Sequence, residues 1–131
     1  MAKNWNLSEC FQKFGATGAN SRWSWSARSP DGAVVVLTLW KDQIEVQGKT
    51  AIYDTFGKNL DKWVDKPGNR ERLENLKWAR DHCDGLFRVV ITTAKDVSAN
   101  PRAISECYPH DMQMRLYDLN EDTGEFRATS V

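Results

Sequence analysis

Two apolar segments joined by a tight turn constrain the fold of this sequence more than any other feature. Residues 22–28 alternate strictly, with Trp23 and Trp25 on one face and polar side chains on the other, as in a β-strand. Residues 29–32 have the sequence Ser-Pro-Asp-Gly, which places proline and glycine where a β-turn favours them. Residues 33–40 are apolar on both faces. The sequence therefore predicts a β-hairpin whose second strand is central in a sheet.

Helical spacing of apolar side chains marks two further segments. Residues 7–14 follow Asn6, the expected N-cap, and carry Glu9 where a capping box needs it. Residues 69–83 form the clearest predicted helix, with Asn69 as its N-cap.

The rest of the chain is predicted from β-branched residues, prolines and turn signals. A short helix is expected to start at Asn100-Pro101 and to stop before Pro109. Residues 41–68 are expected to be long and irregular with one short strand at 43–46, and segments of this kind are more often functional than accidental. Three further strands are predicted, the last two as a hairpin: residues 86–95, 112–119 and 124–129.

The order of these elements predicts one α+β domain over residues 1–131. The strands are joined mostly by local connections, which favours a strongly curved mixed sheet or small β-barrel with peripheral helices. A chain of 131 residues buries enough surface to fold as one domain without a disulfide or a structural metal.

The charge balance argues against several classes of protein. The 18 lysine and arginine residues equal the 18 aspartate and glutamate residues, so the excess positive charge of a sequence-independent nucleic-acid coat protein is lacking. No run approaches the roughly 20 apolar residues that a membrane-spanning helix needs. The first residues have no signal-peptide pattern, which indicates a cytoplasmic protein whose three cysteines are free thiols.

The sequence has few groups suited to catalysis. It contains two histidines and no nucleophile elbow, phosphate-binding loop or His-Glu-x-x-His motif. Zinc could in principle bind between His82-Cys83 and Cys107-x-x-His110, but adjacent helical residues point apart and Cys83 fits the apolar stripe. We therefore expect no enzymatic activity, no metal and no cofactor. The alternative is a small enzyme acting on a nucleotide or small cofactor, with Asp81 or His110 as acid or base.

The six tryptophans are the unusual part of the composition. In the predicted hairpin, Trp40 at the end of the second strand lies near the start of the first, so Trp23, Trp25 and Trp40 should converge. An open corner of indoles suits a flat ring, because stacking contributes roughly 1 to 3 kcal/mol per base. The alternative is that at least two of these indoles belong to the core, where large aromatic side chains contribute much of the packing energy.

Polar groups near this corner could read the edge of a bound ring. Asn20, Ser24 and Asp42 could hydrogen bond to the ring, and Arg22 or Lys95 could hold a phosphate. A single exposed charge is more often only solvated.

Five short motifs between residues 15 and 126 carry a resemblance to a known family. They are Thr17-x-x-Asn20-x-Arg22-Trp23-Ser24-Trp25-Ser26-Ala27, Leu39-Trp40-Lys41-Asp42, Glu71-Arg72-Leu73, Ala94-Lys95-Asp96 and Asn100-Pro101-Arg102-x-Ile104. Together they resemble the EVE-like domains of the PUA superfamily. Domains of this kind are the sensing modules fused to HNH nucleases in modification-dependent restriction enzymes.

The resemblance implies a PUA-like barrel in which a modified base, flipped out of DNA, enters an aromatic cage. The cage walls would be Trp23, Trp25 and Trp40, and Asp42 or Asn20 would contact the ring edge. The phosphate contacts would be Arg22, Lys95 and Arg102.

The chain departs from those enzymes because it carries no nuclease domain and no His-Asn-His set. The resemblance therefore implies a protein that binds methylated or hydroxymethylated DNA without cutting it. It would act with a separately encoded nuclease or as a decoy. Which modification is read, and whether RNA is the ligand, stays open. A protein-interaction module, such as a phage-type inhibitor or adaptor, is the other alternative.

Overall fold

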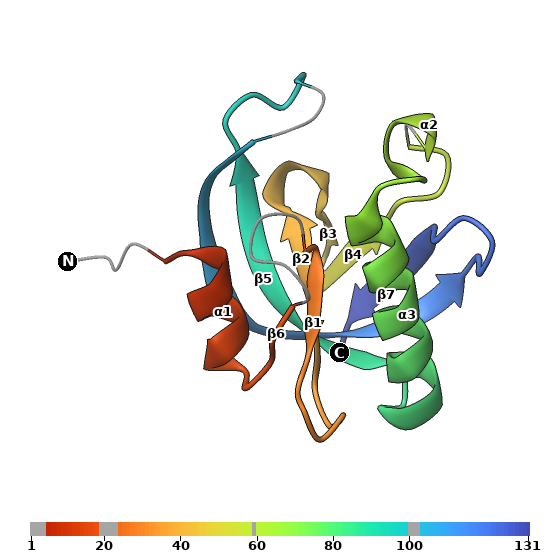
Figure 1. Cartoon of the computed structure of the whole chain (residues 1–131). Coiled ribbons are helices and arrows are strands. Elements are labelled where there is room, and N and C mark those ends of the chain that lie inside the picture. The colour runs from red at the N-terminus through yellow and green to blue at the C-terminus, as the bar shows by residue number, and fades with distance from the viewer. Residues whose placement is uncertain (1–4, 19–23, 59, 100–102) are drawn as a thin grey trace.

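A seven-stranded, mostly antiparallel sheet with helices on both sides forms the part of the chain that the structure describes (Figure 1). The computed structural model describes residues 5–18, 24–58, 60–99 and 103–131. The helices are α1 (Leu7–Lys13), α2 (Leu60–Trp63) and α3 (Pro67–His82), with a 3-10 turn η1 (Lys41–Gln43). The strands are β1 (Ser26–Arg28), β2 (Val35–Trp40), β3 (Glu45–Gln47), β4 (Thr50–Asp54), β5 (Leu86–Ala94), β6 (Ile104–Leu119) and β7 (Phe126–Ser130). This mixed composition agrees with the predicted α+β class.

The sheet curls strongly because one long strand, β6, pairs with a different neighbour in each half of the sheet. The strand order is β1-β2-β5-β6-β7-β4-β3, and β2 and β5 are its parallel pair. The 16-residue β6 pairs with β5 along its first part and with β7 along its second, with register shifts that increase twist. As a result, the Tyr53 hydroxyl of β4 accepts a hydrogen bond of 3.2 Å from the Trp40 backbone N–H of β2, although three strands separate the two in the sheet order.

The core has two parts, one on each face of the sheet. Alternate residues of β2 point to opposite sides: Leu37 belongs to the main cluster under α3, and Val36 belongs to a second cluster under α1. The same alternation separates Val89 from Val90 in β5. Both strands are therefore buried on two faces, which confirms the prediction that residues 33–40 are central.

The local predictions at the first helix and hairpin are confirmed. The Asn6 side chain accepts a 2.8 Å hydrogen bond from the Glu9 backbone N–H, and the Glu9 carboxylate accepts one from Asn6 in return. In the turn, the Gly32 N–H donates to the Ser29 carbonyl at 2.9 Å. Gly32 has φ +74°, and a Cβ there would lie 2.6 Å from the Trp78 ring, so the turn requires glycine.

The prediction that Asn69 caps the long helix is wrong. The helix begins at Pro67, whose missing N–H is tolerated in the first turn, and Lys66 is the N-cap residue. Asn69 is 2% exposed, and its Nδ2 donates to the carbonyls of Val64 and Thr123 at 3.0 and 2.9 Å. Its side chain therefore holds the start of α3 to the segment before β7.

The predicted short helix after Pro101 is also wrong. From Ile104 onward the chain forms the first part of β6, which pairs with β5 and includes Pro109 opposite Val90. Pairing with a distant strand outweighs the local helix signal, which rested on two prolines. Residues 100–102 lie outside the described part of the chain.

The first strand and the irregular segment also differ from expectation. Only Ser26–Arg28 of residues 24–28 is a strand, and Ser24 and Ser26 are buried, so the predicted polar face does not face solvent. Residues 41–68 contain β3 slightly later than expected and a second strand, β4, which pairs with β7.

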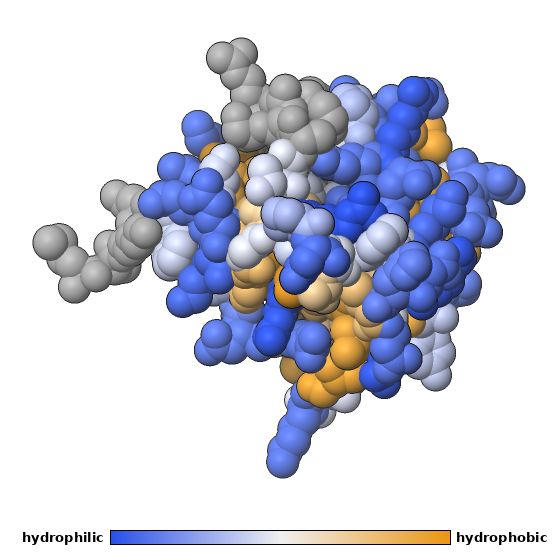
Figure 2. Space-filling view, turned by 60° about the horizontal axis from the view of Figure 1, so that its bottom comes forward, coloured by the Kyte–Doolittle hydropathy of each residue, from blue (hydrophilic) through white to orange (hydrophobic). Residues whose placement is uncertain are grey.

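The face shown in Figure 2 is mainly hydrophilic, with apolar areas between its polar side chains. No helix among the described residues is both long and apolar enough to cross a membrane. The exposed large apolar side chains come from separate segments: Val46, Val97, Ile104, Tyr117 and Val131.

Candidate functional site

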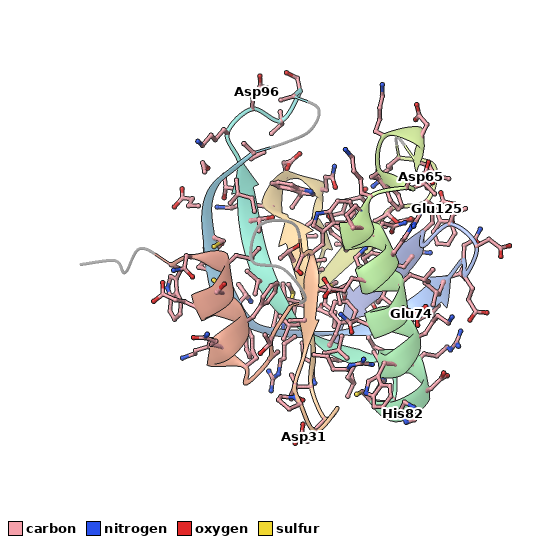
Figure 3. The ribbon with its side chains drawn as sticks, in the orientation of Figure 1. Asp31, Asp65, Glu74, His82, Asp96 and Glu125 are labelled. Carbon is pink, nitrogen blue, oxygen red and sulfur yellow. The ribbon has the colours of Figure 1, made fainter. Side chains whose placement is uncertain are left out.

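A pocket of about 880 Å³ lies at one end of the curled sheet. Its lining comes from the start of the first hairpin, the end of β2, β4, the α2–α3 region and the loop between β5 and β6. Asp65 and Asp96 mark the two loops at this end of the molecule, whereas His82 lies at the other end (Figure 3). The volume falls within the range of pockets that bind small organic ligands.

Three tryptophans contribute to the pocket lining. Trp25, Trp40 and Trp63 are each half-buried, so their rings are neither sealed in the core nor fully in solvent. The Trp25 carbonyl accepts hydrogen bonds from the backbone N–H and the hydroxyl of Thr38, at 2.9 and 3.0 Å, which fix its backbone beside β2. The Trp63 indole N–H donates to the Lys58 carbonyl at 2.9 Å. These contacts fix the backbone of Trp25 and the indole of Trp63.

Arg72 of α3 lines the same pocket and is only 7% exposed. Its guanidinium carbon lies 5.1 Å from the ring centres of both Trp25 and Trp63, and 5.0 Å from that of Phe126. Its Nη2 donates to the Asn69 side-chain oxygen at 3.2 Å. Burial lowers the pKa of Arg72 to about 10, so the side chain is still a cation near neutral pH. Cation–π attraction to the rings offsets part of the cost of burying it.

The pocket is positively charged, although the whole chain is neutral. Lys58, Lys62 and Lys66 join Arg72 in its lining, and no aspartate or glutamate is among the described residues that line it. Lys62 and Lys66 are exposed, whereas Arg72 is buried among the rings. The arrangement therefore combines aromatic surface with positive charge, which suits a ligand that has both a flat ring and an anionic group.

Only some of the site residues predicted from the sequence line the pocket. Trp25, Trp40 and Ser24 line the pocket, and Ser24 is 1% exposed. Asp42 and Lys95 are exposed and are not among the pocket-lining residues, since one lies on η1 and the other just beyond β5. The remaining predicted residues lie outside the described part of the chain: Asn20, Arg22, Trp23 and Arg102.

Sequence reasoning missed Trp63, the three lysines and the role of Arg72. The one usable signal was the length and irregularity of residues 41–68, which marked that segment as functional without placing it. Arg72 lies in one of the motifs of the resemblance, but neither its burial nor its aromatic neighbours follow from a helical pattern.

The groups considered for acid–base or metal chemistry have structural partners. His82 stacks on Trp78 with ring centres 3.9 Å apart, and the His110 Nδ1 accepts a hydrogen bond from the Met112 N–H at 2.9 Å. The Arg80 guanidinium lies 3.0 Å from Asp81 and lowers the pKa of that carboxyl. Asp81 is therefore ionised near neutral pH and is a poor proton donor.

The cysteines are likewise placed in separate surroundings. The Cys10 and Cys107 sulfur atoms are 3.6 Å apart between α1 and β6, whereas Cys83 contacts the Gly32 carbonyl at 3.5 Å. Within the described ranges, no group of three or more histidine, cysteine, aspartate or glutamate side chains is placed to hold a metal ion.

Comparison with known proteins adds no assignment. No protein-family model, curated protein or solved structure matches the chain. The chemistry of the pocket is therefore the basis on which a function can be proposed.

Proposed function

We propose that the protein is a reader of modified bases in DNA that takes a flipped base into this pocket. The observation that carries the proposal is the combination of three indoles and four cationic side chains, without an acidic one, among the described lining residues. In this proposal the curled sheet is a PUA-like barrel of the EVE-like kind, and the base enters at its open end.

Stacking supplies the attraction for the base. Each base stacked on an aromatic side chain contributes about 1 to 3 kcal/mol, which is comparable to the few kcal/mol needed to remove a base from a duplex. The Arg72 guanidinium carbon lies 5.1 Å from the ring centres of both Trp25 and Trp63, so a ring that stacks on either indole would contact aromatic surface beside a buried cation.

The exposed lysines would hold the strand. Lys62 and Lys66 lie on the polar side of the pocket, where they could pair with the phosphates next to the flipped nucleotide. Because the chain has no net charge, phosphate attraction outside the pocket adds little, and affinity should depend on how well the base fits.

A fluorescence titration with matched duplexes tests the proposal. One duplex carries a methylated or hydroxymethylated base at a single position, and its control carries the plain base there. We expect the modified duplex to bind more tightly and to quench indole fluorescence, because three of the tryptophans line the pocket. Equal binding of the two duplexes would count against a modified-base reader, and a single-stranded pair would show whether unpairing limits the affinity.

A further inference from the structure

Arg72 is a buried cation with an unused hydrogen-bond donor. Its Nε is buried and has no hydrogen-bond partner in the described part of the chain. The hydrogen bond found for its side chain is the one from Nη2 to Asn69. The ion pairs between described residues involve Lys77, Arg80 and Arg115, and none involves Arg72.

The cost of this arrangement calls for a compensating contact. Removing a cation from water without a counter-ion is unfavourable by several kcal/mol, and an apolar side chain of similar volume usually avoids that cost. The three surrounding rings attract the positive charge, but their faces offer no lone pair in the plane of the guanidinium. Among the described residues, Asn69 accepts the Nη2 hydrogen bond of the Arg72 side chain, and its own Nδ2 donates to two backbone carbonyls.

We infer that Arg72 donates a hydrogen bond to an oxygen atom on the inserted edge of the base, and that the pocket therefore selects bases that carry such an oxygen. This inference rests on the proposed function, because it assumes that a base enters the pocket. A hydroxymethyl or carboxyl group on a cytosine ring provides an acceptor for the guanidinium of Arg72, which lines the pocket, whereas a methyl group provides none.

The position of Arg72 favours a base edge over a phosphate as its partner. Arg72 is 7% exposed and lies among Trp25, Trp63 and Phe126, within reach of a ring that stacks there. The exposed lysines at the pocket are better placed for the strand phosphates, which stay close to water.

A series of oligonucleotides that differ only in the substituent at C5 of one cytosine tests this selection with the unaltered protein. The four members carry cytosine, 5-methylcytosine, 5-hydroxymethylcytosine or 5-carboxylcytosine at the same site. We expect the hydroxymethyl and carboxyl members to bind about tenfold or more tightly than the methyl member, as for a hydrogen bond to a charged donor. Methyl binding as tight as both oxygenated members would overturn the inference.

Two variants link the preference to Arg72. Arg72→Met keeps a stem of similar length without the charge, and Arg72→Lys keeps the charge without the planar fork. We expect Arg72→Met to bind the methyl and hydroxymethyl members equally, and Arg72→Lys to keep a reduced preference. Replacing a buried charge with an apolar side chain is often tolerated, and a thermal melt checks that each variant is folded. An unchanged preference in folded Arg72→Met would overturn the inference.

Failure of this inference differs from failure of the proposed function. If the three modified members bind equally, and more tightly than both plain cytosine and an oligonucleotide without a base at that position, the pocket reads a modified base and Arg72 does not select it. If removing the base changes nothing, the proposed function itself fails.

Discussion

Replacing Trp25 with alanine is expected to weaken binding of a modified oligonucleotide by about fivefold to a hundredfold, the loss of one stacked base. The effect should be large because Trp25 has two functions in the pocket. Its half-buried ring forms part of the wall, and it lies 5.1 Å from the Arg72 guanidinium, which it helps to keep in place. A titration monitored by fluorescence anisotropy of a labelled oligonucleotide measures the loss without relying on the indoles themselves.

Trp78→Ala is the matched control for Trp25→Ala. Trp78 is also half-buried, packs against the main core and donates from its indole to the Gly32 carbonyl at 2.8 Å, but it does not line the pocket. We expect this variant to lose stability and, while folded, to keep its affinity. Equal losses of affinity in the two variants would mean that Trp25 acts through the fold and does not contact a ligand.

Replacing Phe126 with alanine is expected to lower the free energy of unfolding by about 3 to 5 kcal/mol, as for other buried aromatic side chains. Phe126 is 0% exposed, and its ring centre lies 5.8 Å from that of Tyr53 and 5.0 Å from the Arg72 guanidinium carbon. The melting temperature should fall by roughly 10 °C or more in a thermal unfolding experiment. Removing the ring would also leave a void beside the Arg72 guanidinium.

Tyr117→Ala provides the comparison for Phe126→Ala. Tyr117 lies on the neighbouring strand β6 but is 75% exposed, so its truncation should change stability by no more than about 0.5 kcal/mol. If the two variants melted at the same temperature, Phe126 would not be part of the core that supports the pocket.

Elements that depend on nearby residues could be predicted from the sequence. The capping box needs only Asn6 and Glu9, and the first turn needs only the proline and glycine of residues 29–32. The central position of β2 also followed from its own residues, because a strand buried on both faces is apolar on both faces.

Elements that depend on distant partners could not be predicted in the same way. The first part of β6 is a strand because it pairs with β5, while its prolines suggested a helix. Asparagine is a residue type that often caps helices, which is why the sequence suggested Asn69 as the N-cap. In the structure its side chain is buried and donates hydrogen bonds to the carbonyls of Val64 and Thr123, and Thr123 is 54 residues away.

Only the part of the candidate site that depends on residues near each other in the sequence could be predicted. The approach of Trp40 to Trp25 follows from hairpin register, and both residues line the pocket. Trp63 and Arg72 reach it from α2 and α3, which no local pattern relates to that hairpin.

The most direct test of the central claim compares two oligonucleotides that differ only by the presence of a base. One carries 5-hydroxymethylcytosine at a single position, and the other carries an abasic site there, so their phosphates are the same. If a base occupies the pocket, the first binds and quenches indole fluorescence, whereas the abasic strand loses most of the affinity and all of the quenching. Equal affinity and equal quenching for both strands would contradict the claim, because binding would then depend on the phosphates alone.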